Sequence, residues 1–575
     1  MTERTMALLL ACACFATAAG CRAASSASPV GSNVDAAAPP TPDPQLDPSP
    51  NPDPNVCTVP GTGACTSAPA AIPCPDPVLG ATVYYVCDCG AGADPNCVPG
   101  DDAAAGTSAA APWRSYSRAR QAFGGLPAGG TIAFCRGGSF DATGASSRRW
   151  VATACRADAP CTVRAYAPAW GGGNEPRPIL HAGGENLFAL EDSGEPDTEA
   201  GFVFLDLDLR GDGGGWAFFL YNDVDDVMLC NLAISQFEIG VHVGGANAGG
   251  TGDGKNERVT LRNSEVTGNA GQGWLGSCSG CAIEYSRFDN NGFAQAVFSH
   301  NIYLSGSNGA YAIGERVVGN TLSRSAFVGG ACQGVSLVVH GRHRGLLVEG
   351  NTVFEDPGTA GDGCWGIAVD PGYSEAEGFE DVVITRNVVR DVGNIGIGVA
   401  ACARCTIENN VVIKNTSGVG IAAPDRARGV DDLAQDAVVV RNNSIFLGMD
   451  GTGIRLNADG AGHHAVSNAI LAPGGACFDA DLAPGAYAMF DYNVCQAGVW
   501  EEAAGALTAW QAATGHDAHS LSADPGFAST VAPVDLSSAS ASSAIVDHGH
   551  PSASAPLTAI GAARSSPPDA GAHER

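Results

Sequence analysis

The stretches GNTVFEDPGTAGDGCWGIAVD (350–370), RNVVRDVGNIGIGVA (386–400) and NNVVIKNTSGVGIAA (409–423) repeat one pattern: an asparagine turn, a short apolar strand, a polar loop and a second alternating strand. Related units begin at Asn231, Arg262, Gly319 and Arg441. A period of roughly 20 to 35 residues, with short strands and little helical signal, is typical of a β-solenoid, in which each coil buries its apolar face by stacking on its neighbours. The repeat therefore predicts an all-β solenoid.

Asparagine recurs at the head of each unit. Asn tolerates the left-handed backbone conformation of a sharp turn, and its side-chain amide can bond to the identical amide one coil above. Stacked Asn is a common structural device in cross-β architecture. We therefore expect a turn-forming role, without substrate contact, for Asn263, Asn320, Asn351, Asn387, Asn409 and Asn442.

Composition agrees with this fold and limits the partners. The 575 residues include 77 glycines and 34 prolines, and only 16% are charged, which favours a turn-rich all-β body. The formal net charge of −30 repels nucleic acid and anionic lipid, so we expect no nucleic-acid partner and no broad membrane contact. The same charge repels an acidic polysaccharide unless a bound cation or a local arginine patch inverts the field.

The N-terminus has the pattern of an exported protein. The apolar run from Met6 to Ala19 is too short for a permanent membrane span and predicts a signal peptide. Residues 18–21, Ala-Ala-Gly-Cys, resemble the lipobox of bacterial lipoproteins and predict a signal peptide over 1–21 with lipidation of Cys21; ordinary signal-peptidase cleavage nearby is the alternative. The Pro/Ala/Asp-rich stretch 22–56 cannot bury a core and predicts a disordered linker that holds a domain away from a surface. We expect an outer-membrane or cell-surface lipoprotein, or otherwise a periplasmic or extracellular protein.

Cysteine usage points to the same compartment. Of 21 cysteines, two lie in the signal and Cys21 is the lipidation candidate, which leaves an even 18 for disulfides. Cys155 with Cys161 brackets a short loop, and the pairs Cys278–Cys281 and Cys402–Cys405 have CxxC spacing. No histidine stands at ligand spacing beside either CxxC pair, so disulfides are favoured over zinc or redox sites. The pairing of the cysteines between 57 and 97 is left open.

The stretch from Tyr84 to Phe140 resembles the opening of right-handed parallel β-helix proteins of the pectate-lyase-like superfamily, in their bacterial lipoprotein form. It contains a strand at 84–86, a Gly/Asp loop at 92–94, a Gly-Thr step at 106–107, a Pro-Trp pair at 112–113 and an amphipathic helix near 117–123 that would cap the first coil. The cysteines Cys87, Cys89 and Cys97 depart from that pattern. Similar C-terminal features run from Asp491 to Glu574.

This resemblance implies a domain plan. After a Cys-rich segment at 57–82, a right-handed parallel β-helix with an N-terminal capping helix occupies 83–530, and a C-terminal coil and tail occupies 531–575. The superfamily includes polysaccharide lyases, hydrolases, uronate epimerases, adhesins and members with no assigned activity. The resemblance is thus specific for fold and weak for function.

Candidate site residues follow from aligning the inward apolar positions of the Gly-led strands: Ile302 and Leu304, Val335 and Leu337, Ile367 and Val369, Ile397 and Val399, Ile454 and Leu456. Period-two alternation sends the residues between them outward. In this register Tyr303, Ser336 and Ala368 share one outward row. Ser305, Val338 and Asp370 form the next row, with His340 just beyond.

The strongest local signal is Ser299-His300-Asn301-Ile302-Tyr303, followed one coil later by Val339-His340-Gly341-Arg342-His343-Arg344. Arg can neutralise a uronate carboxylate, and His or Tyr can take and return a proton, which suits β-elimination. We assign candidate catalytic roles to Tyr303, His340 and Arg342, and candidate substrate-binding roles to His300, Ser305 and Asp370. Glycan contact without catalysis and a purely structural role are the alternatives.

Lysine and acidic loops add little. Only Lys255 and Lys414 exist, and Lys414 stands at a turn position that predicts solvated surface. Acidic loops at 94–102 and 223–226 make calcium a candidate cofactor, although neither loop matches an EF-hand. No other cofactor is indicated.

Two function classes follow. The first is a secreted or surface-anchored β-helix protein that interacts with polysaccharide as a lyase or epimerase acting on acidic, uronate-containing glycans. The second is a non-catalytic glycan-binding or structural cell-envelope lipoprotein, attached to the membrane only through an N-terminal lipid. The sequence leaves open whether the protein is an enzyme. A paired-carboxylate hydrolase is disfavoured because Asp370 has no evident partner in register.

Overall fold

The computed structural model describes residues 71–76, 82–144, 148–191, 199–245, 255–306, 310–373, 375–424, 432–456, 460–480 and 483–575. The predicted signal peptide, Cys21 and the linker 22–56 lie outside these residues, as does most of segment 57–82. None of the helices described is long and apolar enough to cross a membrane.

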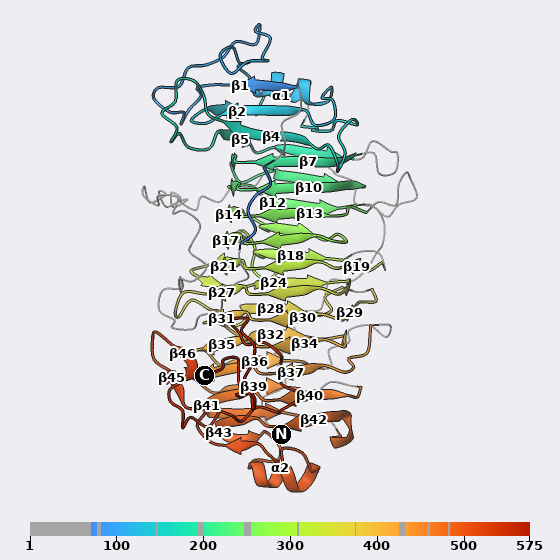
Figure 1. The fold of residues 1–575 in the computed structure, drawn as a ribbon, viewed down its shortest axis with the longest axis vertical. Coiled ribbons are helices and arrows are strands. Elements are labelled where there is room, and N and C mark those ends of the chain that lie inside the picture. The colour runs from blue at the N-terminus through green and yellow to red at the C-terminus, as the bar shows by residue number, and fades with distance from the viewer. Residues whose placement is uncertain are drawn as a thin grey trace, which may run out of the picture. The chain divides into compact units, whose positions relative to one another are not determined.

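Each coil of the described chain contributes three short strands that pair in parallel with the equivalent strands of the next coil. Figure 1 shows these strands stacked coil by coil from β1 to β43. The first sheet contains β1 (Val83–Val86), β2 (Thr131–Cys135), β4 (Cys161–Tyr166), β7 (Glu199–Leu205), β10 (Val224–Cys230), β13 (Val259–Arg262), β16 (Ala282–Glu284), β20 (Arg316–Val318), β26 (Leu347–Glu349), β30 (Val383–Thr385), β34 (Thr406–Glu408), β37 (Val439–Arg441), β40 (His463–Val466) and β42 (Tyr487–Asp491).

The second strand row forms the next face of the coils. It contains β3 (Ser139–Asp141), β5 (Ile179–Gly183), β8 (Asp208–Gly211), β11 (Ala233–Ser235), β14 (Glu265–Thr267), β17 (Arg287–Asp289), β21 (Thr321–Ser323), β27 (Thr352–Phe354), β31 (Val388–Arg390), β35 (Val411–Lys414), β38 (Ser444–Leu447), β41 (Ala469–Asp479), β43 (Val494–Glu501) and β44 (Leu521–Ser522).

The third strand row carries the candidate site. It contains β6 (Phe188–Glu191), β9 (Trp216–Tyr221), β12 (Ile239–Gly244), β15 (Trp274–Gly276), β18 (Ile302–Ser305), β24 (Val335–His340), β28 (Trp365–Val369), β32 (Ile395–Val399), β36 (Gly418–Ala422) and β39 (Gly451–Arg455). The long strand β41 pairs with both β38 and β39, so it joins the second and third rows into one sheet.

Shorter strands complete the list. Beside the third row, β19 (Ala312–Ile313), β25 (Arg342–Arg344), β29 (Gly378–Glu380) and β33 (Cys402–Ala403) form a parallel four-stranded sheet, here the side sheet. Two antiparallel hairpins are β22 (Phe327–Val328) with β23 (Ala331–Cys332), and β45 (Phe527–Ser529) with β46 (Asp535–Ser538).

The core lies between the strand rows. Ile302 pairs in register with Leu337, Leu337 with Ile367, and Ile367 with Ile397, and all four side chains are fully buried. Identical apolar positions therefore stack from coil to coil, as the repeat requires. The predicted parallel β-helix is confirmed by this pairing.

The asparagine prediction is right in kind but joins two different positions. Asn320, Asn351 and Asn387 form a buried ladder that continues through Asn410, Asn443, Asn468 and Asn493. From Asn351 onward, each side-chain oxygen accepts from the backbone and side-chain N–H groups of the Asn one coil before. Asn263, Asn409 and Asn442 instead hold the left-handed position just before the ladder, with φ of 49°, 57° and 50°. Gly and Arg also occupy that position, at Gly350 and Arg386, because only the backbone conformation is required there.

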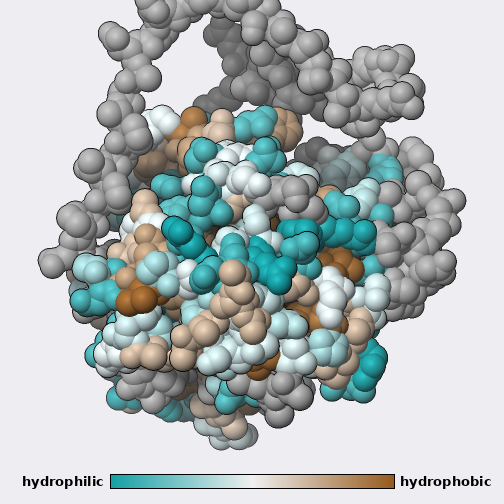
Figure 2. Space-filling view, turned by 90° about the horizontal axis from the view of Figure 1, so that it is seen from above, coloured by the Kyte–Doolittle hydropathy of each residue, from teal (hydrophilic) through white to brown (hydrophobic). Residues whose placement is uncertain are grey.

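Two α-helices lie near the ends of the described solenoid. Helix α1 (Tyr116–Phe123) occupies the region predicted at 117–123 and buries Tyr116, Ala119 and Phe123. Its N-cap is Ser115, whose hydroxyl accepts from the backbone N–H of Arg118. Helix α2 (Leu507–Thr514) buries Trp510, and the 3₁₀ turn η1 (Pro484–Ala486) precedes β42. Figure 2 looks onto the end near β1, where hydrophobic residues form small patches between hydrophilic ones.

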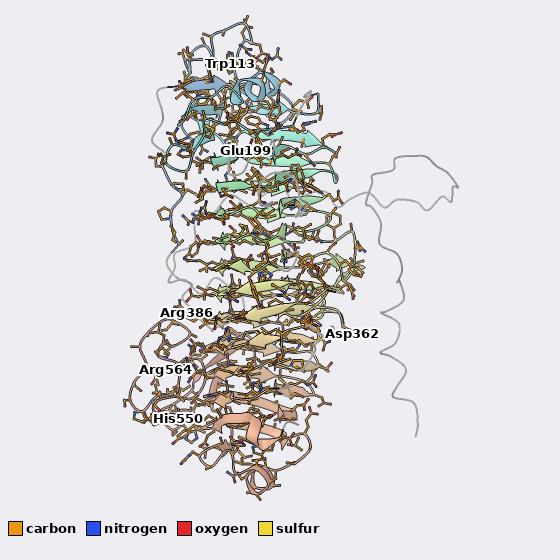
Figure 3. All side chains as sticks on the ribbon, turned by 90° about the vertical axis from the view of Figure 1, so that its right-hand side faces the viewer. Trp113, Glu199, Asp362, Arg386, His550 and Arg564 are labelled. Atoms are coloured by element: carbon orange, nitrogen blue, oxygen red, sulfur yellow. A yellow bond between two sulfur atoms is a disulfide. The ribbon has the colours of Figure 1, made fainter. Side chains whose placement is uncertain are left out.

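The C-terminal segment, residues 525–575, folds back onto the second strand row. Its Phe527, Leu536 and Ile545 join a buried cluster with Ile413 and Phe446 from the outer faces of β35 and β38. Arg564 (Figure 3) donates to the side chain of Asn409 at 2.8 Å. This segment thus covers apolar side chains on the outer faces of β35 and β38 that would otherwise be exposed.

Eight disulfides are present among the described residues, including the three predicted pairs Cys155–Cys161, Cys278–Cys281 and Cys402–Cys405. The others are Cys74–Cys230, Cys87–Cys135, Cys89–Cys97, Cys332–Cys364 and Cys477–Cys495. Disulfides persist in oxidising compartments, so this number supports the expectation of an exported protein.

Candidate functional site

The outer face of strands β18 and β24 brings Tyr303, Ser305 and His340 together, through a register that differs from the predicted one. Tyr303 pairs with Val338, and Ser305 pairs with His340. Ser336 lies two positions earlier, so the predicted alignment of Val335 with Ile302 was wrong by two residues. Because side chains alternate with a period of two, a two-residue shift keeps each side chain on its face and only moves it along the strand.

A row of rings follows from this register. The ring centroids of Tyr303 and His340 are 5.5 Å apart and nearly perpendicular, and those of His300 and Tyr303 are 5.4 Å apart. The ring of Tyr373, from the loop after β28, lies 5.6 Å from His340. We call His300, Tyr303, His340 and Tyr373 the ring row. Its members come from three neighbouring coils, so the rings line up across the coils.

The two phenols of the ring row are directly bonded. The hydroxyl of Tyr303 donates to the hydroxyl of Tyr373 at 2.8 Å, and the side chain of Ser305 also hydrogen-bonds to Tyr373. Burial raises the pKa of both tyrosines. Both phenols are therefore protonated at neutral pH and can donate a proton or a hydrogen bond.

The ring of His340 is held in place by Asp370 of the next coil. Its Nδ1 lies 2.5 Å from the carbonyl oxygen of Asp370, and only a protonated Nδ1 can bond to a carbonyl. In the neutral ring the lone pair then belongs to Nε2. The carboxylate of Asp370 is 3.8 Å from the same Nδ1. Asp370 therefore orients His340, and its own side chain is almost fully buried.

Glu377 closes the other side of the ring row, and the sequence did not single it out. Its carboxylate accepts from the backbone N–H groups of Gly341 at 2.5 Å and Gly372 at 2.6 Å, and from that of Tyr373. Burial raises the pKa of Glu377, while these N–H groups and His340 oppose that shift. Glu377 holds the loop that carries Tyr373. Neither residue belongs to a repeated position, so periodicity could not find them.

Arg342 lies on the side sheet rather than in the ring row. Its Nε donates to the carbonyl oxygen of Ala376 at 3.1 Å, and its guanidinium carbon lies 5.8 Å from the centroid of Tyr311. Arg344 packs closer on the same ring, at 4.4 Å, and pairs with Glu380 at 2.9 Å. Arg342 therefore contacts Ala376, while His340 contacts Tyr373, and the two residues belong to different sheets.

Behind the ring row, His343 occupies a buried polar network. Its Nδ1 contacts the carboxylate of Glu315, and its Nε2 lies 2.9 Å from the carbonyl oxygen of His340. The hydroxyl of Ser277 donates to the same carboxylate. Two acceptors on the two ring nitrogens require a doubly protonated imidazole. Burial alone would lower the pKa of His343, but Glu315 outweighs it and the pKa is raised.

Two further residues considered in the sequence analysis, His300 and Lys414, are buried and bond to backbone carbonyls. His300 is almost fully buried, its Nδ1 contacts the carbonyl oxygen of Val335, and burial lowers its pKa to about 4. The prediction that Lys414 is solvated was wrong: its side chain is fully buried, and Nζ donates to the Val392 carbonyl at 3.0 Å.

Within the described residues, three candidate metal ligands converge at one place, Glu355 with Cys332 and Cys364, and those cysteines are disulfide-bonded. A disulfide sulfur is a poor ligand because the thiolate binds metal. Calcium therefore stays a prediction without a site.

Comparison with known proteins gives a fold likeness. No family model and no curated protein matches the chain. Among solved structures, the chain is similar to pectate lyase Pel9A, with 15% identity over 86% of this chain and 97% of that one and a TM-score of 0.40. Tailspike protein 3 of bacteriophage CBA120 follows, with 14% identity over 71% of this chain and 59% of that one and a TM-score of 0.41. PfbA, a surface adhesin of Streptococcus pneumoniae, has 10% identity over 60% and 82% of the two chains and a TM-score of 0.39.

Proposed function

We propose that this protein is an exported parallel β-helix protein that binds an acidic polysaccharide across the ring row, with Arg342 contacting a sugar carboxylate. The observation that supports this most directly is the mutual contact of Tyr303, His340 and Tyr373 across three coils. Aromatic rings offer flat apolar surface to the faces of sugar rings, while their polar atoms can bond to sugar hydroxyls. Neighbouring coils lie about 4.8 Å apart, so successive rings can face one sugar unit.

The charge distribution supports an acidic ligand at this position. Most guanidinium groups on this acidic protein pair with carboxylates, as Arg344 pairs with Glu380 and Arg316 with Glu284. No carboxylate partner of Arg342 is found in the part of the chain that the structure describes, and its bond is to a carbonyl. An Arg without a carboxylate partner can bind a uronate carboxylate through two parallel hydrogen bonds.

Proton transfer at a uronate is the second candidate function, and one observation favours it. The bonded hydroxyls of Tyr303 and Tyr373 lie beside His340, whose Nε2 carries the lone pair in the neutral ring. A β-elimination or epimerisation needs a base to remove the proton beside the carboxylate and an acid to return a proton. His340 would be the base, and Tyr303, protonated at neutral pH, would be the acid.

Calorimetry with uronate oligosaccharides and a neutral glucan tests the binding proposal. We expect the parent protein to bind at least one uronate polymer, and Arg342→Ala to weaken that binding about tenfold, which corresponds to about 1.4 kcal/mol. Arg316→Ala, on the first sheet, is the matched control and should leave binding unchanged. Equal binding by parent and Arg342→Ala, or preference for the neutral glucan, would contradict the proposal. Appearance of unsaturated-uronate absorbance, lost in His340→Ala, would identify a lyase.

A further inference from the structure

A cavity lies next to the ring row, towards the N-terminal coils. It has a volume of ≈ 270 Å³ and lies along β9, β12 and β18, with Tyr221, His242, Ser277, Ser305 and Tyr311 among its lining residues. Ser305 links it to the ring row because that side chain also bonds to Tyr373. The cavity and the ring row are therefore continuous at Ser305.

Two rings of the cavity wall, His242 and Tyr221, stack on rings that lie outside the lining. His242 lies parallel to Trp216 with centroids 4.7 Å apart, and parallel to Phe219 at 5.3 Å. Tyr221 is stacked on Phe219 at 5.2 Å. The rings hold one another in place, so the wall is formed before a ligand arrives. Burial lowers the pKa of His242 to about 4, so the ring is neutral at neutral pH.

The polar atoms of the cavity are mostly hydroxyls. Tyr221, Ser277, Ser305 and Tyr311 each present one. Two carboxylates bond to lining residues, and both are compensated: Glu315 accepts from Ser277 and pairs with His343, and Glu380 bonds to Tyr311 and pairs with Arg344. Lys255 also lines the cavity and already interacts with another group of the protein. Arg342 and Arg344 pack on the ring of Tyr311, but neither guanidinium is among the lining residues of the cavity. An aromatic wall with hydroxyl groups therefore suits an uncharged sugar unit, while a carboxylate of the same polymer would lie at Arg342.

The register places this cavity in line with the ring row. His242 pairs with Leu275, and Leu275 pairs with Tyr303, so His242 and Tyr303 share one outward row two coils apart. At about 4.8 Å for each coil, the separation is roughly 10 Å along the solenoid axis. One extended oligosaccharide can therefore contact both places when it lies parallel to that axis.

We propose that this cavity binds an uncharged sugar unit of the same polysaccharide whose uronate contacts Arg342 and the ring row. The inference rests on the proposed function and adds to it: the preferred polymer contains both uronate and neutral units. The chain of the polymer then runs along the axis from the cavity towards β28. Tyr221 and His242 act as specificity residues, while Arg342 contributes to binding of every uronate polymer.

Calorimetry with two ligand classes tests this inference. The first class is uniform uronate oligosaccharides, of galacturonate, mannuronate or guluronate; the second alternates glucuronate with an N-acetylhexosamine, as in hyaluronan and chondroitin fragments. We expect the parent to prefer the alternating class, and Tyr221→Ala to weaken that class about tenfold while changing the uniform class less than about twofold. Arg342→Ala should weaken both classes.

Controls separate the possible failures. Tyr285→Ala removes a tyrosine from the first-sheet side and should leave both ligand classes unaffected. Tyr221→Phe keeps the ring and removes only the hydroxyl, so it serves if the alanine variant does not fold, and we expect a loss of about threefold for the alternating class. If the parent binds neither class, the proposed function fails and the inference fails with it. If the parent binds uronates but Tyr221→Ala and Tyr221→Phe weaken both classes or neither, the inference alone is overturned.

Discussion

The imidazole of His343 is fully buried against the carboxylate of Glu315, and its second nitrogen contacts the backbone carbonyl of His340. The histidines and Arg342 of the motif at residues 339–344 thus lie in three different environments. His340 faces outward, His343 faces inward, and Arg342 lies on the side sheet between them. The buried pair supports the strand that carries the candidate site.

Replacing Glu315 by Gln should be strongly destabilising, because it leaves the charge of His343 buried and uncompensated. We expect a loss of about 3 to 5 kcal/mol in the free energy of unfolding at neutral pH, measured by urea denaturation. The folded pKa of His343 is raised, so its contribution is complete below about pH 6.5 and is lost as the pH rises through the folded value. Glu315→Gln should remove that pH dependence. A variant as stable as the parent would show that the pair is not charged.

The asparagine ladder gives a second prediction. Asn387→Ala removes the acceptor for two N–H groups of Asn351 and the donor to the carbonyl of Val348. Unsatisfied buried groups cost about 1 to 3 kcal/mol each, so we expect a loss of at least about 2 kcal/mol. Asn290→Gly is the control at a left-handed position, φ 55°, and should change the free energy of unfolding by less than about 0.5 kcal/mol. Equal effects of the two changes would contradict the distinction between ladder and turn positions.

The fold was predictable because one pattern recurs and each coil obeys the same constraint. The recurring apolar positions Ile302, Leu337 and Ile367 are aligned from coil to coil. The alternation along each strand then determines which side chains face outward. The two-residue error at Val335 did little harm, because it preserved the faces. Asn409 and Asn410 show the limit: adjacent identical residues cannot be told apart by spacing, and only the hydrogen bonds distinguish them.

The candidate site was predictable only in part. Tyr303 and His340 belong to repeated strands, so the repeat brought them together. Tyr373 and Glu377 belong to a loop particular to one coil, and a loop conformation follows from its own backbone bonds rather than from the period. Arg342 lies outside the repeated strand rows, because β25 belongs to a separate sheet after Gly341, whose φ of 102° turns the chain. The spacing of the repeat carries no signal for a separate sheet that begins at this position.

Glu355 provides a third prediction, with a clear dependence on pH. Burial raises its pKa to about 8, and its Oε2 has no partner within the described structure. A carboxyl whose folded pKa is raised leaves stability intact below its unfolded value, near 4.5, and lowers stability as the pH rises towards the folded value. Glu355→Gln should therefore match the parent near pH 4 and exceed it near pH 9, by an amount on the order of 4 kcal/mol.

Urea unfolding at both pH values measures this difference. Glu375→Gln, at an exposed position of another loop, is the control and should change stability equally little at both pH values. If Glu355→Gln is no more stable than the parent at high pH, the carboxylate ionises in the folded state at little cost, and burial does not raise its pKa.

Lys414 provides the last prediction, and it reverses what the sequence indicated. Lys414 is the last residue of β35, next to a polar turn, yet its side chain is fully buried. Its Nζ donates to the carbonyls of Val392 and Gly393 and to the hydroxyl of Thr416. Burial lowers the pKa of Lys414 to about 7. The folded state therefore binds fewer protons than the unfolded state between about pH 7 and pH 10.5, and stability rises with pH across that window.

Comparing the parent with Lys414→Met isolates this effect. We expect the stability of the parent, relative to the variant, to increase between about pH 7 and pH 10 by an amount on the order of 4 kcal/mol, because the ammonium is costly to bury and the neutral amine is not. Lys255→Met, the change at the other lysine, lies at an exposed position and is the control; it should change the free energy of unfolding little. A difference between parent and Lys414→Met that stays constant with pH would mean that the three oxygen acceptors hold the charged form in the fold. In that case Lys414 would stay charged in the folded state, its charge would be balanced by the carbonyl dipoles, and its pKa would not be lowered.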